Sequence, residues 1–205
     1  MADHYLLTDT LAYELPGDAE LADLHYEIGT HFLGFSSRPQ RRPSDGKQFD
    51  STLFIAADQI HAADSLSGSN LDDASSLIKY AQLFLIVGER SVGVADFHSA
   101  LKYLQCGISF LPEDRWRTEY TLSLHLFESA CLSAFACGLT EVMTAFLNEI
   151  LDNARTLEDK MKGLYVLVQS HAKSGQLKEA IERTFSVLED LGKKCEFVQS
   201  RRLVN

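Results

Sequence analysis

The sequence predicts an all-α fold in which antiparallel helical hairpins stack side by side. Apolar residues recur at steps of three and four along most of the chain, which is the period of one helix face. Gly or Pro stands at most of the breaks between these stretches, where helices usually end. Because no stretch alternates with period two for long enough to form a strand, we expect about eight or nine helices and no sheet.

The N-terminal third of the chain predicts three helices and one linker. Two short helical patterns, at about 5–14 and 18–35, are separated by Pro16-Gly17, and Asp18 is expected to cap the second. The segment 36–47 is rich in Arg and Pro, which we interpret as a solvated loop, although its basic residues could also contact an acidic partner. A third helix is expected at about 49–64.

The remainder of the chain predicts three further hairpins. Their helices are expected at about 72–87, 91–111, 116–137, 140–156, 157–174 and 176–191, with ends at Gly88, Pro112, Gly138 and Gly175. Gly lacks a Cβ and permits the left-handed turn that closes a helix, whereas Pro cannot continue one. Each break therefore has a local chemical reason.

The last hairpin contains the pattern of a tetratricopeptide-type repeat, which is Gly175, an apolar residue two positions on and Ala180. A similar half-repeat ends at Pro112. The residues expected to mark the close packing of repeats are Ala100, Gly107, Gly138, Gly175 and Ala180. The glycines are spaced irregularly rather than at the strict period of about 34 residues. We therefore predict an irregular, tetratricopeptide-like right-handed solenoid over 49–205, preceded by N-terminal helices and the Arg/Pro-rich loop over 1–48.

Composition argues against two classes of partner. The 205 residues include 19 basic and 29 acidic side chains, and the net charge of -10 disfavours nucleic acid, whose phosphates are recognised by cations. The longest apolar run, 81–88, is far short of the roughly 20 residues that a bilayer requires, so no membrane association is expected. The N-terminus lacks a secretory pattern, and the four cysteines form no CxxC motif. We expect reduced cysteines and a cytoplasmic protein.

No motif for catalysis or for cofactor binding is visible. The chain lacks a phosphate-binding loop, a dinucleotide fingerprint, a HExxH zinc motif, a GxSxG nucleophile motif and the kinase HRD and DFG triplets. His25 and His31 lie six residues apart, which places their rings on opposite sides of a helix, and no two histidines stand at metal-ligand spacing. We therefore expect no catalytic residue, no cofactor and no metal site.

Three pieces of the chain resemble the helical-repeat region of large multidomain signalling proteins, which combine a Ser/Thr kinase-like domain, a predicted AAA/STAND ATPase and GAF and histidine-kinase modules. The pieces are HYEIGTHFL at 25–33, FIAADQI at 54–60, and 95–192, the last with ALKYLQCGISFL at 100–111, Trp116 with Tyr120, Asp159-Lys160, and Gly175 to Ala180. The kinase and ATPase parts of that family lie outside these residues. The resemblance therefore implies a helical-repeat segment without catalytic residues.

Two classes of function remain open. In the first, the chain is the non-catalytic interaction and regulatory segment of such an ATPase and kinase signalling protein, with its own ATPase or kinase domains or a peptide as partner, and the sequence is a truncated gene model. In the second, it is a free-standing tetratricopeptide-like adaptor that binds peptide segments of other proteins. An all-α enzyme would need polar groups that converge in a pocket, which the sequence does not indicate.

If the chain is an interaction module, its ligand should lie in the groove formed by the first helix of each hairpin, because the second helices form the outer wall of such arrays. The groove-facing candidates lie off the apolar stripes of 116–137 and 157–174. They are Glu119, Ser123 and Glu128 on the former and Lys162, Gln169 and Lys173 on the latter. Lys on one hairpin beside Glu on the next could select a peptide by its charge. Simple solvation of these polar side chains is the alternative interpretation.

Overall fold

A computed structural model describes residues 17–36, 46–67 and 74–176, together with 178, 181, 182 and 184. All regular elements in these residues are helical and none is a strand, as the sequence predicted. The helices are α2 (Asp18–Ser36), α3 (Gly46–Ser67), α4 (Ala74–Gly93), α5 (Phe97–Ser109), α6 (Arg115–Thr118), α7 (Tyr120–Ala136), α8 (Thr140–Asn153) and α9 (Leu157–Lys173). The helix expected at 5–14 and most of that expected at 176–191 lie outside the described residues.

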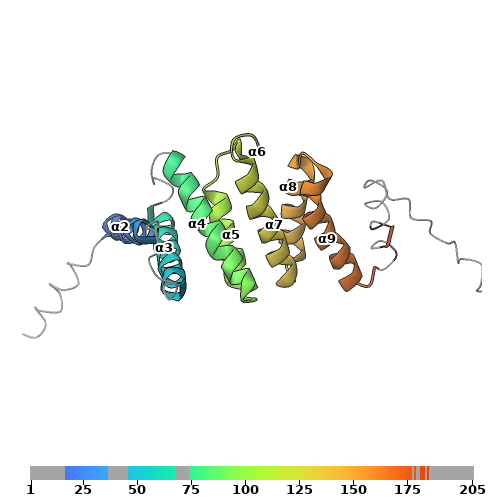
Figure 1. The fold of residues 1–205 in the computed structure, drawn as a ribbon, viewed down its shortest axis with the longest axis horizontal. Helices are drawn as coiled ribbons and strands as arrows, with labels where there is room; N and C mark the ends of the chain where they lie inside the picture. The colour runs from blue at the N-terminus through green and yellow to red at the C-terminus, as the bar shows by residue number, and fades with distance from the viewer. Residues whose placement is uncertain are drawn as a thin grey trace, which may run out of the picture.

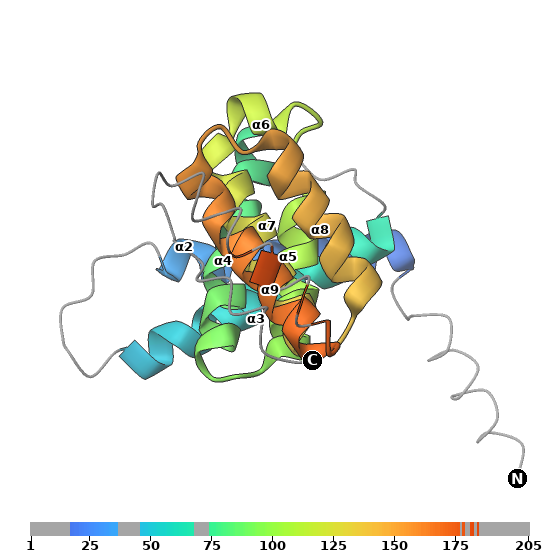
Figure 2. The same ribbon diagram turned by 90° about the vertical axis from the view of Figure 1, so that its right-hand side faces the viewer.

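The helices stand side by side in a row that runs from α2 and α3 at one end to α9 at the other (Figure 1). Sequence neighbours pack against each other as the pairs α2 with α3, α4 with α5, and α7 with α8. Successive pairs are joined by the contacts of α3 with α4, α5 with α7, and α8 with α9, and α7 also contacts α4 and α9. Seen along the row, the pairs lie one behind another (Figure 2).

The core is continuous along this row because each helix shares its apolar face with the next pair. Ile60 of α3, Phe84 of α4, Leu104 of α5, Leu126 of α7 and Ile150 of α8 are all fully buried. Burial of each such side chain contributes about 1.5–3 kcal/mol to the free energy of folding. Packing of this kind, rather than the helix propensity of any one segment, stabilises the array.

The first hairpin is formed by α2 and α3, and it corrects two boundaries. The amide of Leu21 donates to the carbonyl of Gly17 at 2.9 Å, so Gly17 occupies the N-cap and Asp18 lies in the first turn. Helix α3 begins at Gly46, three residues before the start expected at 49. A Cβ on Gly29 would lie 2.8 Å from Ile60 Cγ1, which shows how closely these two helices approach.

Helix α4 does not end at Gly88, as the sequence suggested, but continues to Gly93. Gly88 is needed for packing, because a Cβ there would lie 2.6 Å from Cγ of Leu104 on α5. The reversal comes later, at Ala95, whose φ is 61°. Helix α5 starts at Phe97, six residues after the start expected at 91, and the Asp96 side chain caps it by accepting from the Ser99 amide at 3.2 Å.

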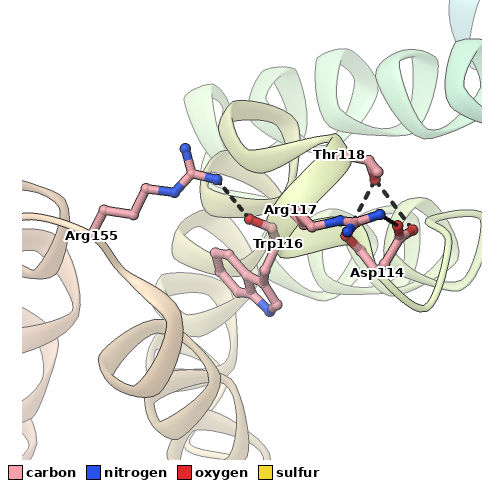
Figure 3. A network of polar contacts seen from close by, with 5 residues as sticks. All are labelled: Asp114, Trp116, Arg117, Thr118 and Arg155. Carbon is pink, nitrogen blue, oxygen red and sulfur yellow. Dashed lines mark hydrogen bonds and ion pairs between the residues drawn. The ribbon is translucent and has the colours of Figure 1, made fainter.

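The single helix expected at 116–137 is divided into the short α6 and the long α7. The guanidinium of Arg155 donates to the Trp116 carbonyl at 3.1 Å, the carbonyl that a continuous helix would pair with the amide of Tyr120. In Figure 3 this contact lies beside the side chains of Arg117 and Thr118, which converge on Asp114. The Trp116 indole donates to Glu149 at 3.0 Å and so ties α6 to α8.

The small residues proposed to mark repeat packing divide into two groups. Ala100 is fully buried in the core. A Cβ on Gly107 would lie 2.8 Å from Leu126 and 3.0 Å from Phe84, so Gly107 sits at a close helix crossing. Gly138 and Gly175 have a φ of 76° and open space around the missing Cβ. They therefore serve the turns that follow α7 and α9 and do not bring helices together. Ala180 lies outside the described residues.

Candidate functional site

A groove of about 450 Å³ lies between α7 and α9, two helices that contact each other. Its lining consists mainly of apolar side chains and includes one carboxylate and one ammonium group. The lining residues are Glu128, Ser129 and Leu132 of α7 and Met161, Lys162, Tyr165 and Val166 of α9. The volume is in the range of ligand pockets, which are mostly apolar with a few polar groups that set orientation.

Helix geometry explains why these side chains share one surface. Glu128 and Leu132 stand four residues apart on α7, and Met161 and Tyr165 stand four residues apart on α9, so each pair lies on one helix face. Val166 is buried at the base of the groove, whereas Tyr165 is 60% exposed. Exposure of so large an aromatic side chain leaves its apolar area available to a ligand.

The charged groups of the groove form an ion pair, in which Lys162 Nζ lies 2.8 Å from Glu128 Oε2. Its two ends differ sharply in environment. The Glu128 side chain is 6% exposed, but that of Lys162 is 71% exposed. A buried carboxylate needs a partner, because an unpaired charge in a place of low dielectric is costly. Lys162 reaches in from the rim and satisfies that need.

The structure brings together Glu128 and Lys162, two of the residues that sequence analysis placed in the groove, but it separates the others. Ser123 is fully buried, and its hydroxyl donates to the Glu119 carbonyl at 2.8 Å. Neither Ser123 nor the buried side chain of Glu128 fits the alternative interpretation of simple solvation. Position 123 faces the core side of α7. Glu119 is half-buried where α7 begins, and Gln169 is exposed on α9.

Lys173 is exposed near the end of α9, where its ammonium lies 5.2 Å from the centre of the Phe135 ring. It lines a second, smaller pocket of about 270 Å³ between the end of α9 and the turn from α7 to α8. This pocket is separate from the groove at Glu128 in its lining residues. The two lysines proposed together from sequence therefore serve different places on the surface.

Sequence reasoning missed the apolar part of the groove. Leu132, Met161, Tyr165 and Val166 occupy helical spacing that is typical of a core stripe, so the pattern gave no reason to separate them from residues buried between helices. A Met and a Tyr side by side on one face were the available signal, because both residue types are common at binding surfaces.

A second group of polar side chains joins α5 to α3. Cys106 Sγ lies 3.2 Å from His61 Nδ1, and the Tyr103 hydroxyl donates to Asp58 at 2.9 Å. Burial raises the pKa of Cys106 to about 11 and lowers the pKa of His61 below 6.5. Both groups are therefore neutral at pH 7, and a neutral thiol is a poor nucleophile. We interpret the pair as a structural contact between helices.

In the part of the chain that the structure describes, no three His, Cys, Asp or Glu side chains lie close enough together to bind a metal ion. Among the same residues, no helix has the length and apolar character to cross a membrane. Comparisons with protein-family models, with curated proteins and with solved structures find no match. The resemblance of three sequence pieces to kinase and ATPase signalling proteins therefore stays a prediction.

Proposed function

We propose that this chain is a non-catalytic interaction and regulatory segment that binds a protein or peptide in the groove between α7 and α9. The observation that carries the proposal is the groove itself, with its apolar walls, its exposed Tyr165 and its paired charges. A rigid helical surface of this kind suits recognition of a peptide, because apolar side chains contribute affinity and a few polar groups set register.

The order of helix contacts supports a tetratricopeptide-like solenoid. In such an array the second helix of each hairpin packs on the first helix of the next, and the first helices of neighbouring hairpins also meet. The contacts of α5 with α7 and of α8 with α9 have the former character, and those of α4 with α7 and of α7 with α9 have the latter. A ligand between α7 and α9 would then lie between the first helices of two hairpins.

We further propose that the parent is a cytoplasmic ATPase and kinase signalling protein, for which the three resembling pieces are the support. Mapping of the transcript tests this part. An upstream, in-frame phosphate-binding loop would assign the chain to such a protein, whereas a transcript without one would favour a free-standing adaptor. In either case the purified chain should hydrolyse no ATP above a heat-killed control, because no phosphate cradle is visible in its sequence.

Selection from a phage-displayed library of random dodecapeptides tests the groove directly. We expect enrichment on the wild-type chain and its loss on Ser129→Trp, since Ser129 lines the groove and an indole there would fill it. Thr121→Trp, at an exposed position of the same helix, is the matched control and should retain binding. Absence of enrichment on the wild type, or equal binding to Ser129→Trp, would refute the groove as the binding surface.

A further inference from the structure

The groove between α7 and α9 is unusual in that its carboxylate is buried while the cation that neutralises it is not. Glu128 and Lys162 are the charged residues among those that line it. The Lys162 side chain is 71% exposed and extends over the groove to reach Glu128 at 2.8 Å. Holding this long, solvated side chain in one geometry costs rotamer entropy, which lowers the net free energy that the ion pair contributes.

A ligand that enters the groove changes the balance of this pair, because it removes the water that solvates the ammonium of Lys162. The pair must then be retained in a drier place or be replaced by a cation that the ligand provides. A guanidinium is suited to replacement, since its planar fork can make two parallel bonds to a carboxylate and it is more weakly hydrated than an ammonium. Lys162 would return to solvent, where it is already mostly exposed.

An acidic ligand would act in the opposite direction. A carboxylate that drew Lys162 away would leave Glu128 buried without a counter-charge, which is the costly outcome for a group that is 6% exposed. The net charge of -10 adds to this preference at long range, because it attracts cationic segments and repels acidic ones.

We propose that the occupant of the groove is a basic and apolar peptide segment, whose arginine replaces Lys162 on Glu128. An aliphatic side chain next to that arginine packs among Leu132, Met161 and Val166, and Tyr165 covers it from the rim. This inference rests on the proposed function and names the partner by its chemistry. The groove then selects by a charge exchange, in which the cation of the protein yields to the cation of the ligand.

The dodecapeptides selected on the wild-type chain give the first test. Enrichment of arginine next to aliphatic residues supports the inference. Enrichment of acidic or uncharged peptides whose binding is lost on Ser129→Trp would overturn the inference and leave the proposed function standing. Absence of any enrichment would remove both. Replacement of the arginine by glutamine in the most enriched peptide should weaken binding about tenfold or more, as fluorescence polarisation measures. This measurement uses the unmodified protein and needs no variant to fold.

Two protein variants give the second test. Glu128→Gln should weaken the arginine peptide about tenfold or more, with Glu89→Gln, at an exposed position of α4, as its matched control. Lys162→Ala removes the competing cation and should bind the peptide at least as tightly as the wild type, with Lys79→Ala as control. A loss of affinity in Lys162→Ala as large as that in Glu128→Gln would contradict the exchange and show that Lys162 itself holds the ligand.

Discussion

Gly107 lies where three helices meet, and the substitution Gly107→Ala measures how closely they are packed. A methyl group there would lie 2.8 Å from Leu126 Cδ2 on α7 and 3.0 Å from Phe84 Cβ on α4. Both neighbours are fully buried, and the Cβ of Phe84 cannot move without the backbone of α4. Overpacking of this kind costs about 1–3 kcal/mol.

The same substitution also has a favourable part, because Ala is the better helix former by about 0.5–1 kcal/mol. Gly93→Ala isolates that part, since Gly93 is also near the C-terminal end of a helix and has nothing within 4 Å of the missing Cβ. We expect Gly93→Ala to stabilise the protein slightly and Gly107→Ala to destabilise it by about 1 kcal/mol, a difference of about 2 kcal/mol between the two.

Urea unfolding followed by far-ultraviolet circular dichroism measures this difference. With a slope of about 2 kcal/mol per molar urea, the two midpoints should lie about 1 M apart, with wild type between them. Equal midpoints, or a Gly107→Ala midpoint above that of wild type, would refute the reasoning, because α4, α5 and α7 would then admit a methyl group at no cost.

Three further predictions concern the polar contacts and the thiols. Arg155→Ala should lower the free energy of unfolding by about 1 kcal/mol, since it removes the cation that lies 4.0 Å from the centre of the Tyr120 ring and the hydrogen bond to the Trp116 carbonyl. An unchanged urea midpoint would contradict this. Tyr120 donates to Asp159 at 2.6 Å and lowers the pKa of that carboxyl below its ordinary value of 3.8. The stability that this bond contributes is present above pH 3.8 and is lost as the pH falls through the lowered pKa. The free energy of unfolding should therefore fall less below pH 4 in Tyr120→Phe than in wild type. The same fall in both proteins would count against the bond. Cys131 is fully buried, and burial raises its pKa to about 12. Iodoacetamide at pH 8 should therefore label the partly exposed Cys137 before Cys131. Equal labelling rates of the two thiols by mass spectrometry would show that α7 opens readily.

Much of the helical framework follows from local sequence alone. The bounds expected for α2, α8 and α9 lie within a few residues of those observed, because apolar periodicity and terminal signals act within a few residues along the chain. Thr156, for example, caps α9 by accepting from the amide of Asp159 at 3.2 Å. Such a signal is the same whatever packs nearby.

Other features depended on residues far away in the sequence. The local sequence predicts a helix end at Gly88. In the structure Gly88 lies inside α4, where the Leu104 side chain leaves no room for a Cβ. At the break between α6 and α7, the Trp116 carbonyl accepts from Arg155, a residue that follows α8. The local pattern around Gly88 and Trp116 does not reveal Leu104 or Arg155, because these residues make their contacts through the tertiary structure.

The candidate groove shows the same division between local and tertiary information. The sequence by itself determined that Glu128 and Lys162 are polar residues on two separate helices, since helix period and turn positions decide that much. Only the tertiary structure decided that Glu128 is buried and Lys162 exposed, that the two lie 2.8 Å apart, and that Met161 and Tyr165 line the same groove. Burial is a property of what packs against a side chain, and the crossing of α9 over α7 is set by contacts between distant segments.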